Sequence, residues 1–479
     1  MGIGVSNWVL ARAVAMHGQM GVVSGTCMDS LMVRRLQDGD LGGHVRRAIA
    51  AFPFPEIGSE VIDKYFLPGG REEGQSYALL PMYKQAVSVM RDQITILANF
   101  VEVHLAKEGH DGVVGINLLT KIQMPNLASL YGAMLAGVDC VLMGAGIPKE
   151  IPGALDALSE GRPAALTLDV EGLDRGEKFE VTFDPADFTG GTAPKLPRPF
   201  FLPIISSDSL GRMLVKRSNG HVDGFIVEGP TAGGHNAPPR GQTVYNERGE
   251  PIYGERDVTN LDTLATLGLP FWLAGGSGSP EGVTAAIKSG AHGVQVGTLF
   301  AYCDESGIDR GLKDQVLEQA LSAKLDVFTD DRASPTGFPF KVVQIDGTNA
   351  SKSNYEARTR VCDLGYLRTA YKRDDGRLGY RCASEPVATY EKKGGTAEDA
   401  DGRKCLCNAL MADIGHPQVQ RNGDVERAIL TSGDDLIKIS EFLEGRATYA
   451  ATDVLAWLET GMPADALAQA RQTEVVAGD

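Results

Sequence analysis

The sequence predicts an α/β fold of the TIM type: a (β/α)8 barrel with insertions, joined to a C-terminal α+β subdomain that carries cysteines. Short apolar runs alternate with helix-length amphipathic segments along the chain. This alternation is typical of a parallel sheet whose strands are joined by helices. The 479 residues also suit a barrel of about 250 residues or more with an added domain. We place the barrel at residues 1–345 and the subdomain at 346–479.

The first repeat of the predicted barrel is irregular. A Gly-rich loop and a helix at residues 8–16 precede the strand at 21–24, although a barrel should begin with a strand. We therefore expect the first barrel strand to be incomplete, or the natural start to lie upstream. Later strands are predicted at 113–118, 140–143, 164–169, 201–206 and 225–227, and in the runs PFWLAGG and GVQVGTLF. Helices are predicted at 126–136, 148–160, 210–216, 260–267 and 312–323.

Three segments rich in turn residues interrupt this repeat and are predicted to be insertions. They lie near residues 52–75, 171–199 and 240–257. In the second of them, the alternating sequence KFEVTFD predicts a hairpin-like excursion. In the C-terminal region, Asp375-Gly376 predicts a hairpin turn. Helices are predicted there at 424–430, 434–444 and 451–459.

A candidate phosphate site lies in the stretch LAGGSGSPEGVTAAIKSGAHGVQVGTLF, residues 273–300. Its first strand ends in Gly275 and Gly276 just before a helix, whose N-terminal N–H groups and dipole favour a phosphate. Its second strand ends in Gly297 and Thr298, which allow close backbone approach and add a hydroxyl donor. The two strand ends together predict a phosphate site, and ordinary turn glycines are the alternative. A dinucleotide fold fits less well, because no G-x-G-x-x-G opens a helix with an acidic residue about 20 positions later.

Composition argues against several classes of function. The net charge of −16 disfavours a nucleic acid or an anionic membrane as partner, since both need a basic surface. No apolar run approaches the roughly 18 residues of a membrane span, and the N-terminus lacks a signal-peptide pattern. The sequence contains no G-x-S-x-G, H-E-x-x-H or P-loop motif, which argues against hydrolases, zinc proteases and nucleoside triphosphatases. We expect a cytoplasmic protein.

The seven cysteines fall into two groups. Cys27, Cys140 and Cys303 are isolated in apolar surroundings and are predicted to be small buried side chains. The other four lie within one C-terminal region: Cys362, Cys382, Cys405 and Cys407. Four thiolates can hold zinc or an iron–sulfur cluster, although C-x-C is not the usual C-x-x-C spacing. A zinc site, an iron–sulfur cluster and unliganded buried thiols therefore remain as alternatives.

Four motifs together resemble the nitronate monooxygenase family, also called 2-nitropropane dioxygenases. They are the starting MGIGVSNWVLARAV, NLLTK at 117–121, EGPTAGGH at 228–235, and the stretch 273–300. The resemblance covers about residues 1–343, and flavin-dependent enoyl-acyl carrier protein reductases are similar relatives. It implies a β/α barrel that binds FMN.

The resemblance also implies individual site residues. His235 would be the catalytic histidine, because an imidazole can exchange a proton beside a flavin at cellular pH or stabilise an anionic substrate as imidazolium. A loop histidine bonded to the backbone is the alternative. The FMN phosphate would lie on Gly275, Gly276, Gly297 and Thr298. Gln295 would lie near the flavin ring or ribityl chain, and Asn117 would face the ring. The full set of implied FMN-binding residues is Asn117, Gly233, Gly234, Gly275, Gly276, Gln295, Gly297 and Thr298.

Three functions remain open from the sequence. The first, implied by the resemblance, is an FMN-dependent oxidation of an alkyl nitronate with oxygen. The second is an NAD(P)H-dependent reductase of an enoyl thioester, such as an acyl carrier protein substrate, which the insertions and the extra domain suit better than a small nitronate. The third is a flavin- or metal-binding assembly component without turnover. The C-terminal region would cap the barrel mouth, form a homodimer interface or dock an electron-transfer partner.

Overall fold

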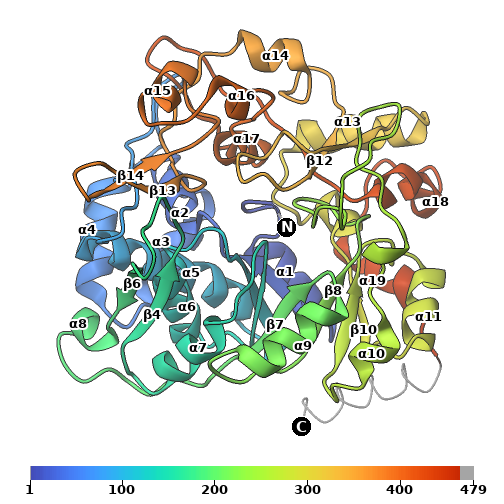
Figure 1. Ribbon diagram of the computed structural model, residues 1–479, viewed down its shortest axis with the longest axis horizontal. Helices are drawn as coiled ribbons and strands as arrows, with labels where there is room; N and C mark the ends of the chain where they lie inside the picture. The colour runs from blue at the N-terminus through green and yellow to red at the C-terminus, as the bar shows by residue number, and fades with distance from the viewer. Residues whose placement is uncertain (1, 464–479) are drawn as a thin grey trace.

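A curled parallel sheet forms the centre of the molecule (Figure 1). The computed structural model describes residues 2–463. Seven parallel strands pair in the order β1-β2-β3-β7-β8-β9-β10. Their bounds are β1 Gly21–Ser24, β2 Val114–Leu119, β3 Cys140–Gly144, β7 Phe200–Ile205, β8 Phe225–Glu228, β9 Phe271–Ala274 and β10 Gly293–Gln295. Over residues 2–463 the sheet has seven strands where the sequence predicts eight, and its edge strands β1 and β10 do not pair with each other.

One strand predicted for the barrel lies outside this sheet. Ala164–Leu168 (β4) pairs antiparallel with Phe179–Phe183 (β6), so the prediction of a barrel strand at 164–169 is wrong. The burial of β4 gives the reason. Ala165 is exposed and Thr167 is half-buried, whereas β3 is buried along its whole length. A strand with one open face suits a hairpin, while parallel strands are covered on both faces.

Helices connect the strands and pack around the sheet. The longest, α5 (Val89–Lys107), is buried along most of its length and packs against α1, α2, α3, α4 and α6. Among residues 2–463, no helix has both the length and the apolar composition needed to cross a membrane. The other helical bounds up to residue 321 are α1 Trp8–Ala15, α2 Met28–Gln37, η1 Leu41–Gly43, α3 His44–Ala50, α4 Pro55–Tyr65, α6 Asn126–Leu135, α7 Ile151–Ser159, α8 Pro185–Thr189, α9 Asp208–Arg217, η2 Glu255–Asp257, α10 Leu261–Ala265, α11 Pro280–Lys288, α12 Thr298–Ala301 and α13 Arg310–Leu321.

The stretch 273–300 folds as strand, turn, helix and strand, as predicted. Helix α11 starts directly after the Gly-rich turn because Ser279 caps it, accepting the Gly282 N–H at 3.0 Å, and Pro280 occupies its first turn. On either side of α11, β9 and β10 pair in parallel, with Trp272 opposite Gly293. The two glycine-bearing strand ends are therefore neighbours.

The C-terminal region packs against the sheet and its helices. Its hairpin, β13 (Thr369–Lys372) and β14 (Leu378–Arg381), confirms the turn predicted at Asp375-Gly376, and β13 also pairs with β5 (Val170–Glu171) of the second predicted insertion. Residues 424–430 contain no helix, so that prediction is wrong; their backbone instead bonds to neighbouring segments, as in Asn349 N–H to Ala428 O. The remaining bounds are β11 Val327–Asp330, β12 Phe340–Val343, α14 Lys352–Ala357, α15 Val387–Lys392, α16 Ala397–Ala400, α17 Leu406–Asp413, η3 Asp434–Lys438, α18 Ile439–Leu443 and α19 Ala451–Glu459.

The last helix shares its apolar contacts with the start of the chain. In α19, Val454, Leu455 and Leu458 belong to one buried cluster with Leu10 and Val14 of α1. In Figure 1, α14 to α17 lie at the top of the view and α19 lies beside α11. The boundary predicted near residue 345 therefore crosses continuous hydrophobic packing.

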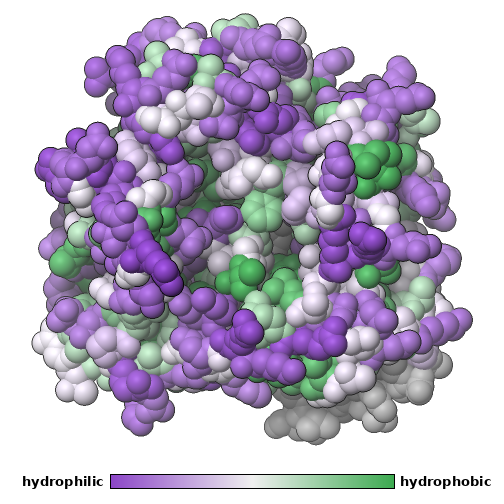
Figure 2. Space-filling model, viewed as in Figure 1, coloured by the Kyte–Doolittle hydropathy of each residue, from purple (hydrophilic) through white to green (hydrophobic). Residues whose placement is uncertain are grey.

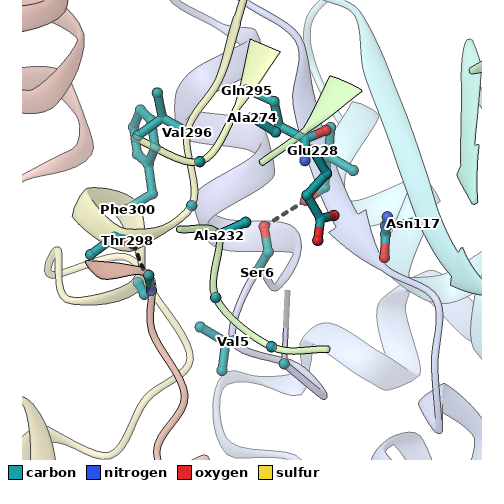
Figure 3. Close-up of a pocket in the computed structure, with 18 of the residues that line it drawn as sticks. Val5, Ser6, Asn117, Glu228, Ala232, Ala274, Gln295, Val296, Thr298 and Phe300 are labelled. Atoms are coloured by element: carbon teal, nitrogen blue, oxygen red, sulfur yellow. Dashed lines mark hydrogen bonds between the residues drawn. The ribbon is translucent and has the colours of Figure 1, made fainter. Parts of the chain in front are cut away.

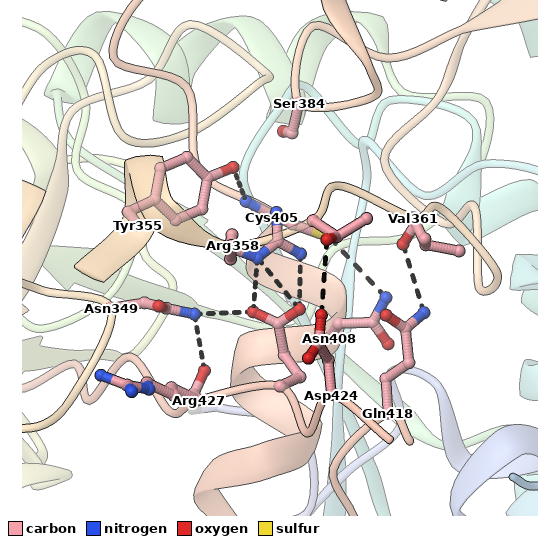
Figure 4. A network of polar contacts seen from close by, with 12 residues as sticks. Asn349, Tyr355, Arg358, Val361, Ser384, Cys405, Asn408, Gln418, Asp424 and Arg427 are labelled. Carbon is pink, nitrogen blue, oxygen red and sulfur yellow. Dashed lines mark hydrogen bonds and ion pairs between the residues drawn. The ribbon is translucent and has the colours of Figure 1, made fainter. Parts of the chain in front are cut away.

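A buried ion pair holds part of the C-terminal region together (Figure 4). Arg358 Nε donates to Glu426 Oε1 at 2.9 Å, and the Glu426 side chain is only 1% exposed. Asn349 Nδ2 also donates to Glu426 Oε1, at 2.6 Å, and to the Arg427 carbonyl at 2.9 Å. Two side chains, Arg358 and Asn349, thus donate to a carboxylate that is closed off from water, and a buried ionised group requires such partners.

Removing the arginine from this pair is expected to destabilise the fold. Arg358→Met leaves the Glu426 carboxylate buried without its cation, and should lower the free energy of unfolding by about 3 kcal/mol. Urea denaturation followed by circular dichroism measures the change. The double variant Arg358→Met, Glu426→Leu is the control, since replacing both charges with apolar groups should recover most of the loss. Equal destabilisation in the single and double variants would contradict this account.

Candidate active site at the mouth of the sheet

A cavity of about 460 Å³ runs from the carboxyl ends of the parallel strands into the curled sheet. Figure 2 shows a hollow near the centre of the view, where hydrophobic surface appears within a mostly hydrophilic rim. Of the nine residues predicted for the flavin site, Gly276 is the one that does not line the cavity. The eight that do are Asn117, Gly233, Gly234, His235, Gly275, Gln295, Gly297 and Thr298.

His235 lies at the end of the loop that follows β8. Its Nε2 is 2.7 Å from Ser334 Oγ, which in turn is 2.7 Å from Thr336 Oγ1, and the Phe340 ring packs edge-on at 4.9 Å between ring centroids. Burial lowers the pKa of His235 to about 4. The imidazole is therefore neutral at pH 7, which suits a proton acceptor and disfavours the imidazolium version of the predicted role.

The loop of residues 229–235 is held by a segment almost two hundred positions later. The Gly234 N–H donates to Thr431 Oγ1 at 2.8 Å, and the Asp434 N–H donates to the Thr231 carbonyl at 2.9 Å. A Cβ on Gly233 would lie 2.7 Å from the Gly433 nitrogen, so the missing side chain of Gly233 makes room for this segment. We call residues 431–435 the clamp segment.

The clamp segment also reaches the predicted phosphate site. The Gly433 N–H donates to Thr298 Oγ1 at 3.1 Å, which leaves the hydroxyl hydrogen of Thr298 available (Figure 3). Asp435 lies beside the Gly-rich turn: its carboxylate oxygen is 3.1 Å from the position that a Cβ on Gly278 would take. Burial raises the pKa of Asp435, while hydrogen bonds from the Gly278 and Gly276 N–H groups act in the opposite direction. The Asp435 carboxylate thus accepts N–H groups of the turn that would otherwise be free to bind a phosphate.

Neutralising this carboxylate is expected to strengthen phosphate binding. Asp435→Asn removes a negative charge that would face a bound phosphate, so the dissociation constant for FMN should fall about tenfold. Quenching of FMN fluorescence during titration measures it. Riboflavin, which has no phosphate, serves as the control ligand and should bind both proteins alike. Weaker FMN binding by Asp435→Asn would mean that the carboxylate supports the ligand.

Glu228 is a second titratable group in the cavity wall. It ends β8, opposite Ala274 of β9, and its carboxyl extends into the cavity between Ser6 and Asn117 (Figure 3). Burial raises the pKa of Glu228 to about 7. Sequence reasoning placed Glu228 in a motif without giving it a role. It missed Ser334 and the clamp segment entirely, because no motif marks them.

Comparison with known proteins agrees with the motifs. Residues 198–333 match the family model described as nitronate monooxygenase. The chain is related to the nitronate monooxygenase family. A nitronate monooxygenase of Pseudomonas aeruginosa is 37% identical over 93 residues, which are 19% of this chain and 24% of that protein. The family resemblance inferred from EGPTAGGH and the 273–300 stretch is therefore confirmed.

A second relative extends the similarity to nearly half of the chain. It is the (3aS,4S,5R,7aS)-5-hydroxy-7a-methyl-1-oxo-octahydro-1H-indene-4-carboxyl-CoA dehydrogenase of Mycobacterium tuberculosis, 27% identical over 240 residues, or 48% of this chain and 60% of that protein. The chain thus spans less than two thirds of the length of either relative. The solved structure of FabK from Thermotoga maritima has a TM-score of 0.46 at 15% identity, covering 98% of this chain and 92% of that one.

The four late cysteines converge, but not on a metal site. Cys362, Cys382, Cys405 and Cys407 line one cavity of only about 10 Å³. Across residues 2–463, no three or more His, Cys, Asp or Glu side chains are arranged to hold a metal ion. Burial raises the pKa of Cys405 to about 11 and the pKa values of the other three above the usual thiol value, so the unliganded thiols are protonated at pH 7. The zinc and iron–sulfur predictions are therefore not supported, and buried thiols remain.

Proposed function

We propose that the protein is an FMN-dependent oxidoreductase that oxidises an alkyl nitronate with oxygen. The observation that carries the proposal is the convergence of eight motif residues, from four separate strand ends, on one cavity of about 460 Å³. A cavity of this size is in the range of cofactor-binding sites. The family match over residues 198–333 supports the nitronate as substrate.

The residues present fit a flavin. Gln295 Oε1 is buried in the wall without a hydrogen-bond partner in the described part of the chain, so it can accept from an N–H group of a ligand. A Cβ on Gly297 would meet nothing within 4 Å, which leaves open space at the end of β10. Gly275 has a φ of 83°, and this left-handed conformation turns the chain at the end of β9. The Asp435 carboxylate, which lies beside the Gly-rich turn, opposes a phosphate there.

In this proposal each side chain has a limited task. Bound FMN would supply the exchange of electrons between the substrate and oxygen. Asn117 and Gln295 would orient the ring with their amide groups, and neutral His235 would hold or accept a proton beside it. Ser334 would keep the His235 ring in place through the 2.7 Å contact with Nε2.

A thioester substrate is the second candidate. The relative from Mycobacterium tuberculosis, whose name describes a CoA thioester dehydrogenase, gives the longer of the two alignments, 240 residues against 93. In that case NAD(P)H would reduce the flavin and an enoyl thioester would be reduced. The apolar cluster between α1 and α19, at one end of the cavity, is consistent with an acyl chain.

Purified protein separates these candidates. A visible spectrum with flavin bands supports the proposed cofactor, and a colourless folded protein that does not take up FMN contradicts it. Oxygen consumption with propane-2-nitronate supports the first candidate, whereas NADH or NADPH oxidation that depends on crotonyl-CoA supports the second. A flavin-containing protein without either activity would favour the third function considered from the sequence, a flavin-binding assembly component without turnover.

A further inference from the structure

A second cavity lies on the other side of His235. Its volume is about 220 Å³, and it is lined by residues from β7, the loop after β8, and the third predicted insertion. The wall is largely apolar, with Ile147, Ile205, Leu210 and Phe338 among its side chains. The residues that line both this cavity and the larger one are Ala145, Ile204, Glu228 and His235. The two cavities thus meet at two titratable side chains.

Three of the other polar side chains of the second cavity are engaged by the protein itself, whereas the buried Asn236 Oδ1 has no hydrogen-bond partner in residues 2–463. Asp257 accepts the N–H groups of Arg240 and Gly254, both at 2.8 Å. Tyr253 OH donates to the Ala237 carbonyl at 3.0 Å, and Arg240 Nη2 donates to the Ser206 carbonyl at 3.3 Å. Glu228 differs from these three, because residues 2–463 give its carboxyl no hydrogen bond and no ion pair. It remains available to a ligand.

We propose that the second cavity holds the substrate, and that the neutral Glu228 carboxyl donates a hydrogen bond to an anionic oxygen of that substrate. The inference rests on the proposed flavin function and adds the place where the substrate, a short apolar chain that ends in a two-oxygen anion, binds and the side chain that holds its anion. The apolar wall would surround the chain, and the oxygens would lie at the junction between Glu228 and His235. Glu228 would donate the hydrogen bond and His235 would stay neutral beside the oxygens, so the two groups divide the roles.

Burial of Glu228 makes the neutral form of its carboxyl accessible near pH 7. Burial raises the pKa of its carboxyl to about 7, as it would for any carboxyl placed among Ile204, Ala274 and similar neighbours. Below that pH the carboxyl can donate; above it, the ionised form repels an anion. The titratable groups that share the two cavities with it are Cys27, His235, Arg240, Tyr253, Asp257, His292, Tyr366, Cys407, Asp413, Asp435 and Glu459.

Isobutyrate tests this role without turnover. It has the shape and charge of propane-2-nitronate but is not oxidised, and it stays anionic from pH 6 to pH 9. Calorimetric titration should show binding to the wild-type protein that weakens about 10- to 100-fold between pH 6 and pH 9. Glu228→Gln keeps an N–H donor that does not titrate, so its dissociation constant should be nearly the same at both pH values. Glu228→Ala should bind weakly at both.

Two further variants locate the ligand and control for charge. Ser206→Phe places a ring in the second cavity and should abolish isobutyrate binding while FMN binding is kept. Glu255→Gln, on the exposed surface of the same insertion, should keep the wild-type pH dependence. Circular dichroism checks that each variant is folded.

Two outcomes would overturn the inference. They are a wild-type pH dependence in Glu228→Gln, and undiminished isobutyrate binding in Ser206→Phe. Failure to bind FMN would instead overturn the proposed function, and the calorimetric experiment would still report on the second cavity because it needs no chromophore.

Discussion

His235→Asn is expected to lower kcat/KM by about 10²- to 10⁴-fold while the protein keeps its FMN. The neutral imidazole sits at the junction of the two cavities, and asparagine retains a similar size and hydrogen bonding but cannot take up a proton. Oxygen uptake with propane-2-nitronate measures the activity, and the visible spectrum measures the bound flavin. The structure thus separates chemistry from cofactor binding at this residue.

Two variants control this result. Ser334→Ala removes the partner 2.7 Å from His235 Nε2 and should cause a smaller loss, since the ring stays but is less well held. His221→Asn changes an exposed histidine that pairs with Asp223 at 3.3 Å and should leave activity intact. Full activity in His235→Asn would show that the histidine only shapes the loop, as a backbone-bonded residue would.

Gly297→Glu is expected to weaken FMN binding about 100-fold or more without unfolding the protein. Gly297 has an ordinary φ of −115°, and a Cβ there meets no atom within 4 Å, so the larger side chain enters the cavity and not the fold. Its carboxylate would face the phosphate of the cofactor. Titration of apoprotein with FMN, followed by fluorescence, measures the loss.

The position chosen matters for the interpretation. Gly191→Glu makes the same substitution at an exposed glycine that also has open space, and should bind FMN normally. Gly275→Ala would be a poor test, because Gly275 has a φ of 83° and a Cβ would lie 2.8 Å from the Ala232 nitrogen. If the Gly275→Ala variant lost FMN, the loss would reflect backbone strain and not a lost contact with the cofactor. Normal FMN affinity in Gly297→Glu would place the phosphate elsewhere.

Much of the sheet could be predicted from the sequence, because each β/α unit is a local pattern. The strands at β2, β3 and β9 are short apolar runs followed by a turn and a helix, and the structure has them where the pattern predicts. The strand at 164–168 could not be assigned to its sheet, since the choice of partner is a long-range property. The alternation of buried and exposed side chains along β4, with Ala165 exposed, distinguishes this hairpin strand from the parallel strands only in the folded structure.

The same distinction applies to the candidate site. Gly275, Gly297 and His235 lie in motifs that are continuous in sequence, so they could be predicted from it. The partner of His235, Ser334, is 99 residues away, and no local pattern marks it. The pKa shifts could not be predicted from the sequence either. Burial lowers the pKa of His235 and raises that of Glu228, and burial depends on the whole fold.

The clamp segment has a consequence for how the protein acquires its cofactor during synthesis. The hydrogen bond from Gly234 to Thr431 joins residues 197 positions apart, so it cannot form until most of the chain has left the ribosome. A nascent chain that ends after α13 already contains all seven parallel strands and every residue predicted to bind the flavin. It still lacks the segment that fixes the 229–235 loop. Stable cofactor loading is therefore expected to be post-translational, with maturation ordered from the sheet to the site.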